Sequence, residues 1–377
     1  MADRIRVLQL IPTLDGYGAE KQMTLLACGL PRDQFEVHVA VLTRTGPYEA
    51  RLRAAGVPVC FLHKRLKFDP FALWRLKRLL DRWQPDILHT WLFAANSYGR
   101  LVAGGRDRPR VIVSERCVDV WKAGWQRWLD RRLIERTHRL VANSASVARF
   151  YRDLGMPEPR LVVIRNAVEV PDDSGQPLPA AQRQRLLAHL GFPQDAKVVG
   201  YVGRIARQKR VDDLIWAAEL LRRIDDRAWF LIAGDGPERD KMQRFAEQVG
   251  VAERIRFLGH RDDVPQLLRL IDVFWQASDF EGLSNSVMEA MAAARPVVVS
   301  DIAPNRELVS DGETGLIVPV GDRLGFAKAA AGLLADPERA GRLGQAAQQR
   351  MKADFSVSRM IDAHAELYRE QKTELTR

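Results

Sequence analysis

A basic loop follows a glycine-terminated strand in the stretch VGRIARQKRVDD, residues 202–213, and three of its basic residues are candidates to bind an anion. They are Arg204, Lys209 and Arg210, and they come just before a predicted helix. Long cations at the carboxyl end of a strand can converge on one dianion, an arginine through its planar fork and a lysine as a point charge. A diphosphate fits this arrangement. A solvated basic loop is the alternative for such a stretch taken alone.

Two carboxylates lie around a second loop, in DFEGLSNSVMEAMAAARPVVVSD, residues 279–301. The loop ends at a predicted helix start, where free backbone N–H groups favour an anion and Ser284 or Asn285 would cap the helix. Glu289, one to two turns into that helix, could accept hydrogen bonds from a vicinal diol such as a ribose. Glu281, in the loop, could bind the hydroxyls of another sugar. An exposed surface acid is the alternative for Glu289.

These loops belong to a strand–loop–helix pattern that occurs twice along the chain. A strand at 4–12 runs through glycines into a helix, and short strands then alternate with amphipathic helices up to 160–166. The segment VPDDSGQPLPAAQ, residues 170–182, is rich in Pro, Gly and Asp and indicates a linker. The pattern restarts with KVVGYVGR, residues 197–204. Such alternation predicts two doubly wound α/β halves with parallel sheets, Rossmann-like, facing each other across a cleft.

Composition restricts the class of protein. The chain has 377 residues, of which 46% are apolar and 28% charged, and no apolar run is long enough to span a membrane. The first residues, MADRIRVLQLIP, carry charges where a signal peptide needs a continuous apolar region, so we expect a first strand there. Cys28, Cys60 and Cys117 show neither paired nor metal-ligand spacing, which fits a reduced, cytoplasmic setting.

The net charge of +10 comes entirely from the first half of the chain. Residues 1–175 hold 29 basic and 19 acidic side chains, whereas residues 176–377 hold 29 of each. This asymmetry suggests a basic surface that faces an anionic membrane, a phosphorylated acceptor or nucleic acid, with a merely solvated arginine-rich surface as the alternative. No nucleic-acid motif occurs, and the glycine motifs of dinucleotide and P-loop sites are missing. Nucleic acid, a dinucleotide dehydrogenase and a P-loop ATPase are therefore disfavoured.

Together these motifs resemble the retaining glycosyltransferases of family 4, which have the GT-B fold. The resemblance depends on Glu281 and Glu289, an E-x7-E pair, and on VGRIARQK, LIAGDGPE, IRFLGHRDDV and GETGLIVPVGD. GYGAE and LVANSASVARF in the first half are weaker marks of the family. The resemblance implies an acceptor-side domain over residues 1–172 and a nucleotide-sugar domain over 173–352. It also implies that a C-terminal helix, residues 353–377, packs back on the first domain.

The resemblance implies a role for each matching residue. Arg204 and Lys209 would hold the diphosphate of a nucleotide-sugar donor and stabilise charge on the leaving group. Glu281 would bind the donor sugar, and Glu289 the ribose hydroxyls. The other implied donor contacts are Gly16, Gly18, Arg116, Gly203, Asp235, Leu258, Gly282, Leu283 and Ser284.

One position departs from the family pattern. Many members carry a His-Gly dipeptide after the fifth strand, where this chain has Glu115 and Arg116 in VIVSERCVD. Glu115 is consequently a candidate contact for the sugar or the acceptor. His89, which ends the preceding strand at the expected rim of the cleft, is another candidate, and a structural histidine is the alternative.

No D-x-D motif occurs in the chain, so the resemblance implies an enzyme without a metal or cofactor. Arg204, Lys209 and a helix N-terminus could replace a metal electrostatically. The predicted reaction transfers a sugar to an acceptor hydroxyl on a lipid-linked, polysaccharide or lipopolysaccharide glycan. A nucleotide-sugar 2-epimerase of the same fold and a non-catalytic nucleotide-sugar-binding protein are the alternatives. A glycosidase is disfavoured, because it needs no diphosphate clamp.

The segment VWKAGWQRWLDRRLIERTHR, residues 120–139, suggests where such an acceptor would be met. If it is one helix, Trp121, Trp125 and Trp128 share an arc of roughly 60°, with Arg132 on the same side. Tryptophans mixed with arginines are typical of an interfacial helix beside anionic lipid. We hypothesise a peripheral protein at the cytoplasmic membrane face. The alternative is tryptophans packed under the cleft loops while the arginines reach solvent.

Overall fold

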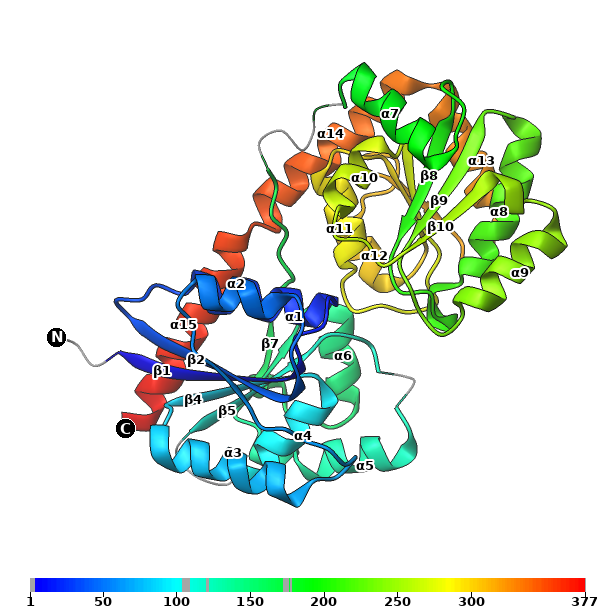
Figure 1. Cartoon of the computed structure of the whole chain (residues 1–377). Coiled ribbons are helices and arrows are strands. Elements are labelled where there is room, and N and C mark those ends of the chain that lie inside the picture. The colour runs from blue at the N-terminus through cyan, green and yellow to red at the C-terminus, as the bar shows by residue number, and fades with distance from the viewer. Residues whose placement is uncertain (1–3, 104–108, 120–121, 172–175, 177, 377) are drawn as a thin grey trace. The chain divides into compact units, whose positions relative to one another are not determined.

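The computed structural model describes residues 4–103, 109–119, 122–171, 176 and 178–376, and it divides into two compact units (Figure 1). The first unit combines Met1–Ala167 with Val357–Arg377, and the second comprises Val168–Ser356. The chain thus leaves the first unit at Ala167 and returns to it at Val357. The two boundaries predicted from the sequence lie after residues 172 and 352.

A seven-stranded parallel sheet forms the centre of the first unit, in the order β3-β2-β1-β4-β5-β6-β7. Its strands are β1 (Ile5–Thr13), β2 (Phe35–Arg44), β3 (Val59–Phe61), β4 (Ile87–Trp91), β5 (Arg110–Glu115), β6 (Arg139–Ala142) and β7 (Leu161–Val163). All five residues of the central strand β4 are buried, because helices cover both faces of a parallel sheet.

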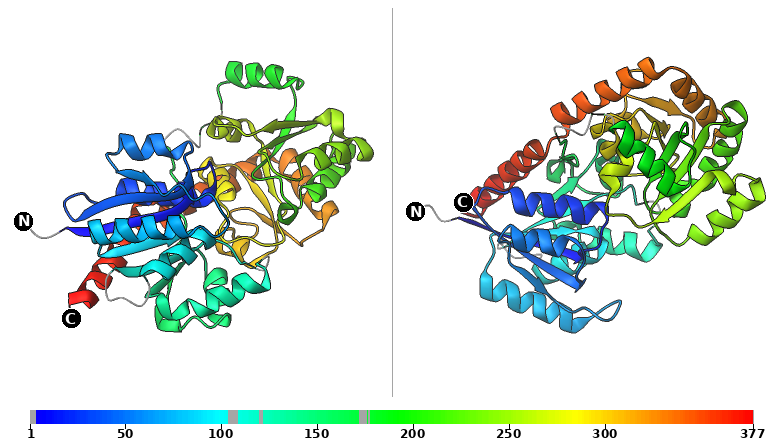
Figure 2. Two further views of the ribbon diagram at one scale, coloured as in Figure 1. Left: turned by 60° about the horizontal axis from the view of Figure 1, so that its bottom comes forward. Right: turned by 45° about the horizontal axis from the view of Figure 1, so that its top comes forward.

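Successive side chains of a strand point to opposite faces of the sheet, and this alternation divides the core of the first unit into two layers. Val7 and Ile11 of β1 pack with α1 and α15 on one face, whereas Leu8 and Leu10 pack with α3, α4 and α6 on the other. The helices are α1 (Gly18–Gly29), α2 (Tyr48–Ala54), α3 (Pro70–Trp83), α4 (Leu92–Ala103), α5 (Gly124–Arg132), α6 (Ala145–Asp153) and α15 (Val357–Thr376). Figure 2 shows α15 running beside α1.

A six-stranded parallel sheet forms the centre of the second unit, in the order β10-β9-β8-β11-β12-β13. Its strands are β8 (Lys197–Val202), β9 (Ala228–Ala233), β10 (Ile255–Gly259), β11 (Val273–Gln276), β12 (Val297–Ser300) and β13 (Leu316–Val318). Its helices are α7 (Ala180–Leu190), α8 (Val211–Ile224), α9 (Arg239–Val249), α10 (Val264–Leu270), α11 (Asn285–Ala292), α12 (Ala303–Leu308), α13 (Arg323–Ala335) and α14 (Pro337–Asp354). The two parallel sheets confirm the predicted Rossmann-like, doubly wound α/β class.

The segment 120–139 is not the single helix that we considered. Helix α5 begins at Gly124 and ends at Arg132, and a separate 3₁₀ turn follows at Ile134–Arg136. The backbone is extended at Ala123, directly before the helix, and the side chain of Lys122 is buried. The predicted Trp121 lies outside the described residues.

Candidate active site

Two loops of the second unit lie at the carboxyl ends of neighbouring strands. Residues 203–210 follow β8, and residues 277–284 follow β11, the next strand in the sheet. Asp279 N donates to the Gln208 carbonyl (2.9 Å), and Arg210 Nη1 donates to Asp279 Oδ1 (2.9 Å), so the loops are joined. In open parallel sheets this edge is the one at which ligands bind.

The loops bring two of the predicted catalytic residues into direct contact. Lys209 Nζ forms an ion pair with Glu281 Oε1, and the Glu281 side chain is only 8% exposed. Ser278 Oγ (2.7 Å) and Gln276 Nε2 (2.9 Å) donate to the same oxygen. Asn305 Nδ2 donates to Gln276 Oε1 (2.9 Å) and fixes that amide. Burying a carboxylate is costly unless it is paired, and here three side chains bind it while Asn305 holds one of them in place.

The other predicted residues of these loops lie on the same edge of the sheet. Arg204 is exposed, and its carbonyl accepts a 2.9 Å hydrogen bond from Tyr201 Oη. Ser284 is the N-cap of α11 and accepts from Val287 N, so of the two candidate caps it is Ser284 that acts. Glu289 is half-buried, unlike a solvated surface acid. Two further predicted contacts, Gly282 and Leu283, are buried.

Glycines allow the ends of three strands to approach one another closely. Gly203 N donates to the Ala233 carbonyl (2.9 Å), and Gly234 N donates to the Gly259 carbonyl (2.7 Å). A Cβ on Gly234 would lie 1.9 Å from the Gly203 oxygen, so no larger residue fits there. The exposed Asp235 follows directly, and this close packing therefore sets its position beside the loop after β8.

Leu258, a predicted nucleoside contact, is half-buried near the end of β10. It lines a cavity of about 170 Å³. The other lining residues are Leu186, His189, Leu190, Arg256, Arg261, Asp263 and Leu267. The cavity therefore lies between the edge strand of the second sheet and helices α7 and α10.

In the first unit, the predicted glycines lie in and just after the loop that follows β1. Gly16 is exposed and Gly18 is the first residue of α1. An ion pair between Asp15 and Arg44 (2.5 Å) holds the loop against the end of β2. Glu20, in the first turn of α1, is buried, and burial raises its pKa.

His89 is a core residue, and the expectation of a rim position is wrong. Its side chain is fully buried, with Nδ1 2.6 Å from Tyr368 Oη and Nε2 2.7 Å from Ser114 Oγ. Burial holds the pKa of His89 well below its ordinary range. The physical reason is that α15 covers the central strand β4, so both ring nitrogens find partners inside the unit.

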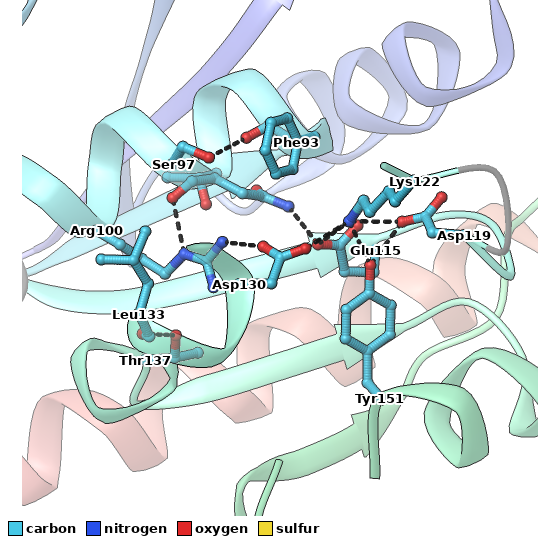
Figure 3. A network of polar contacts seen from close by, with 12 residues as sticks. Phe93, Ser97, Arg100, Glu115, Asp119, Lys122, Asp130, Leu133, Thr137 and Tyr151 are labelled. Atoms are coloured by element: carbon cyan, nitrogen blue, oxygen red, sulfur yellow. Dashed lines mark hydrogen bonds and ion pairs between the residues drawn. The ribbon is translucent and has the colours of Figure 1, made fainter. Parts of the chain in front are cut away.

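Glu115 is likewise buried, which corrects its assignment as a candidate substrate contact. It is 2% exposed and belongs to a polar cluster between β5, α4, α5 and α6 (Figure 3). Asn96 Nδ2 donates to Glu115 Oε1 (3.0 Å), and Lys122 Nζ lies 3.7 Å from that oxygen. Lys122 also pairs with Asp119 (2.8 Å) and Asp130 (2.9 Å). The remaining members are Arg100, bound to Asp130 at 2.6 Å, and Tyr151, which donates to Asp119 at 2.6 Å.

Arg116 is partly buried and packs on an aromatic ring. Its guanidinium lies 4.1 Å from the centre of the Trp91 ring, and Nη1 donates to Asn166 Oδ1 (3.1 Å). Nη2 donates to Ser114 Oγ (3.4 Å). Burial lowers the pKa of Arg116 to about 9, which still leaves it charged at neutral pH. Any donor contact of Arg116 would therefore be made by a cation whose orientation is already fixed.

We expect Glu115 to make the stability of the first unit depend on pH. Burial raises its pKa from 4.5 to about 7, Asp119 and Asp130 add to the shift, and Lys122 opposes it. Between these values the folded state holds a proton that the unfolded chain releases, so its contribution to stability falls as the pH rises from 4.5 to about 7. The measurement is the unfolding free energy of the parent and of Glu115→Gln across this window. Parallel curves for the two proteins would contradict the assignment.

Comparison with known proteins gives two matching family models. The Glycosyltransferase Family 4 model matches residues 17–171, and the Glycosyl transferases group 1 model matches residues 182–350. The putative glycosyltransferase EpsD of Bacillus subtilis (strain 168) is 29% identical over 346 residues, which are 89% of each chain. A glycogen synthase of Mycobacterium tuberculosis is 32% identical over 315 residues, 78% of this chain and 71% of the relative.

A solved structure of Anabaena Alr3699/HepE in complex with UDP-glucose has the same fold. It matches with a TM-score of 0.86 at 20% identity, over 97% of this chain and 100% of the other. Within the parts of the chain that the structure describes, no helix combines the length and apolarity that crossing a membrane requires.

Proposed function

We propose, because this chain belongs to the GT-B glycosyltransferases that join a Glycosyltransferase Family 4 domain to a group 1 domain, that it transfers a sugar from a nucleoside-diphosphate sugar to an acceptor hydroxyl with retention of configuration. The observation that most directly supports this reaction is the contact between Lys209 and Glu281 at the ligand-binding edge of the second sheet. A nucleotide-sugar donor offers both a diphosphate for the cation and hydroxyls for the carboxylate.

In the proposed mechanism each of these side chains has a separate task. Arg204, which is exposed, and Lys209 stabilise the negative charge that develops on the leaving diphosphate. The side chains of Ser278, Gln276 and Lys209 all donate hydrogen bonds to Oε1 of Glu281. We assign the other oxygen, Oε2, to the hydroxyls of the sugar that is transferred. The acceptor attacks from the face of the leaving group, and the departing phosphate takes the proton of the acceptor hydroxyl.

Glu289 and the glycine loops complete the proposed donor site. Glu289 accepts hydrogen bonds from the ribose hydroxyls, and the N-terminus of α11 contributes backbone N–H groups, capped by Ser284. The exposed Asp235 and the half-buried Leu258 flank the nucleoside. Gly16, Gly18 and Arg116 of the first unit are the proposed contacts from the acceptor side. No metal ion or cofactor is part of this proposal.

The proposed acceptor is a lipid-linked or polysaccharide glycan met at a membrane surface. Trp125 is 63% exposed and Trp128 is 59% exposed on α5, and the Arg132 guanidinium lies over the Trp128 ring at 5.7 Å. Such exposed aromatic and basic side chains suit the headgroup region of anionic lipid. The proposal therefore includes a peripheral location at the cytoplasmic face of a membrane.

The stereochemistry and metal requirement of the reaction can be tested together. We expect an α-linked product from an α-linked nucleotide sugar, formed in excess EDTA, because side chains and a helix start supply the charge that a metal would otherwise provide. The measurement is NMR of the product, with and without acceptor. A β-linked product or loss of activity in the chelator would contradict the proposal. Epimerised donor without acceptor would favour the 2-epimerase, and binding without turnover a non-catalytic protein.

A further inference from the structure

Four large apolar side chains lie exposed within nine residues of the first unit. Leu66 is 62% exposed, Phe68 60%, Phe71 71% and Trp74 56%. They occupy the loop after β3 and the first two turns of α3, and we call these four residues the α3 surface. Single exposed apolar residues are ordinary, whereas a contiguous group of them is typical of a surface that meets a partner or a membrane.

The fold holds these side chains outward. Asp69 is buried and caps α3, accepting from Phe71 N (3.0 Å) and Ala72 N (3.2 Å), and its second oxygen accepts from Arg65 N (2.8 Å). Tyr98 Oη binds Asp69 N (2.7 Å) and ties the loop to α4. The opposite side of α3, with Ala72, Leu76 and Leu80, is buried in the core. The exposure of the α3 surface therefore follows from a capped and anchored helix rather than from a loose loop.

Basic residues lie among and next to the residues of the α3 surface in the sequence. Residues 64–78 contain six lysines and arginines and a single acid, the buried Asp69. The basic residues are Lys64, Arg65, Lys67, Arg75, Lys77 and Arg78. The Arg78 guanidinium lies 5.5 Å from the centre of the Trp74 ring. Lysine is depleted from protein–protein interfaces, whereas cations among aromatic rings suit anionic headgroups, so the composition favours lipid over a protein partner.

We propose that the α3 surface docks the protein on an anionic lipid bilayer. The four apolar side chains enter the boundary between headgroups and acyl chains, and the neighbouring cations contact lipid phosphates. The loop lies at the carboxyl end of β3, the same edge of the first sheet at which the loop containing Gly16 follows β1. If the acceptor is lipid-linked, which depends on the function proposed above, docking would bring it to this edge.

The test is co-sedimentation with phosphatidylcholine vesicles that contain or lack phosphatidylglycerol, at low and high salt. The parent should bind the anionic vesicles at low salt, and salt should weaken binding because it screens the cations. Phe71→Ala/Trp74→Ala should weaken binding roughly tenfold or more, because each large side chain loses its burial in lipid. Ile224→Ala/Leu324→Ala, which removes two exposed apolar side chains from the second unit, should bind like the parent.

Several outcomes would overturn the proposal. One is parent-like binding by Phe71→Ala/Trp74→Ala, including the case in which only Trp125→Ala/Trp128→Ala loses binding. Another is equal binding to neutral and anionic vesicles. A third is a dimer of the parent in light scattering that is monomeric in the Phe71→Ala/Trp74→Ala variant. Release of nucleoside diphosphate from a nucleotide sugar in the absence of vesicles should be the same in this variant and in the parent. Vesicle binding without release of nucleoside diphosphate would count against the proposed reaction alone. Release of nucleoside diphosphate without vesicle binding would count against docking alone.

Discussion

Replacing Lys209 with alanine is expected to lower kcat/KM by on the order of a hundredfold, because removing one group that stabilises charge in the transition state typically costs about 2–4 kcal/mol. The structure indicates a second cause of lost activity, because Lys209 is the ion-pair partner of Glu281, whose side chain is 8% exposed. Without the lysine, the carboxylate keeps the neutral donors Ser278 and Gln276 but loses its cation. Steady-state kinetics with donor and acceptor measure the effect.

The same contact predicts how mutations combine. Lys209→Ala and Glu281→Gln should be strongly non-additive, because the two side chains touch and each change disrupts the same pair. Arg204→Ala should lower activity by a similar factor through the diphosphate. Arg207→Ala is the matched control, an exposed cation of the same loop for which we propose no contact. Additive losses from the pair, or a parent-like Lys209→Ala, would show that the site has been misplaced.

Replacing Lys122 with methionine is expected to lower the unfolding free energy of the first unit by about 3–5 kcal/mol, which is the usual cost of removing one partner of a buried ion pair. Lys122 is 3% exposed and is paired with Asp119, Asp130 and Glu115. These carboxylates raise its pKa above the ordinary lysine range despite burial. In thermal unfolding the midpoint of the unit should fall by roughly 10 °C.

A matched control and a pH series make this result specific. Lys77→Met breaks an exposed pair with Asp81, both partners of which are about half exposed, and should change stability little. The Lys122→Met deficit should shrink at lower pH, because protonation of the stranded carboxylates removes the uncompensated charge. A deficit that is independent of pH would indicate lost packing instead of lost charge compensation.

Local sequence patterns predicted the sheets but not every boundary. Apolar strands alternate with amphipathic helices in both halves, and that alternation determines a parallel α/β fold. The Pro- and Gly-rich segment at 170–182 indicated the end of the first domain too late. The chain leaves the unit at Ala167, whose backbone N–H and carbonyl both bind the Gln22 side chain at 2.8 Å. A contact across 145 residues has no local signature.

In the candidate site, too, local sequence patterns predicted some features and missed those that depend on contacts between distant residues. The motifs placed Lys209 and Glu281 in two loops, and the structure shows that these loops follow adjacent strands, which brings the two side chains together. The support of Glu281 was missed, although Gln276 and Ser278 at the end of a buried strand were a usable signal. The burial of Glu115 depends on Lys122 and Asp130, which come after the end of β5 in the sequence and carry no motif that links them to it. His89 is buried by Tyr368, which lies 279 residues further along the chain.

The return of the chain to the first unit has a consequence for how the protein is made. The core of that unit includes Tyr368 of α15, whose hydroxyl binds Gln9 Nε2 (3.0 Å) and His89, and Lys372, which pairs with the buried Asp86 (2.6 Å). A ribosome delivers all of the second unit before it delivers these groups. Domains usually fold in order from the N-terminus during synthesis. Here the first unit lacks these partners for Gln9, His89 and Asp86 until the whole of the second unit has been translated.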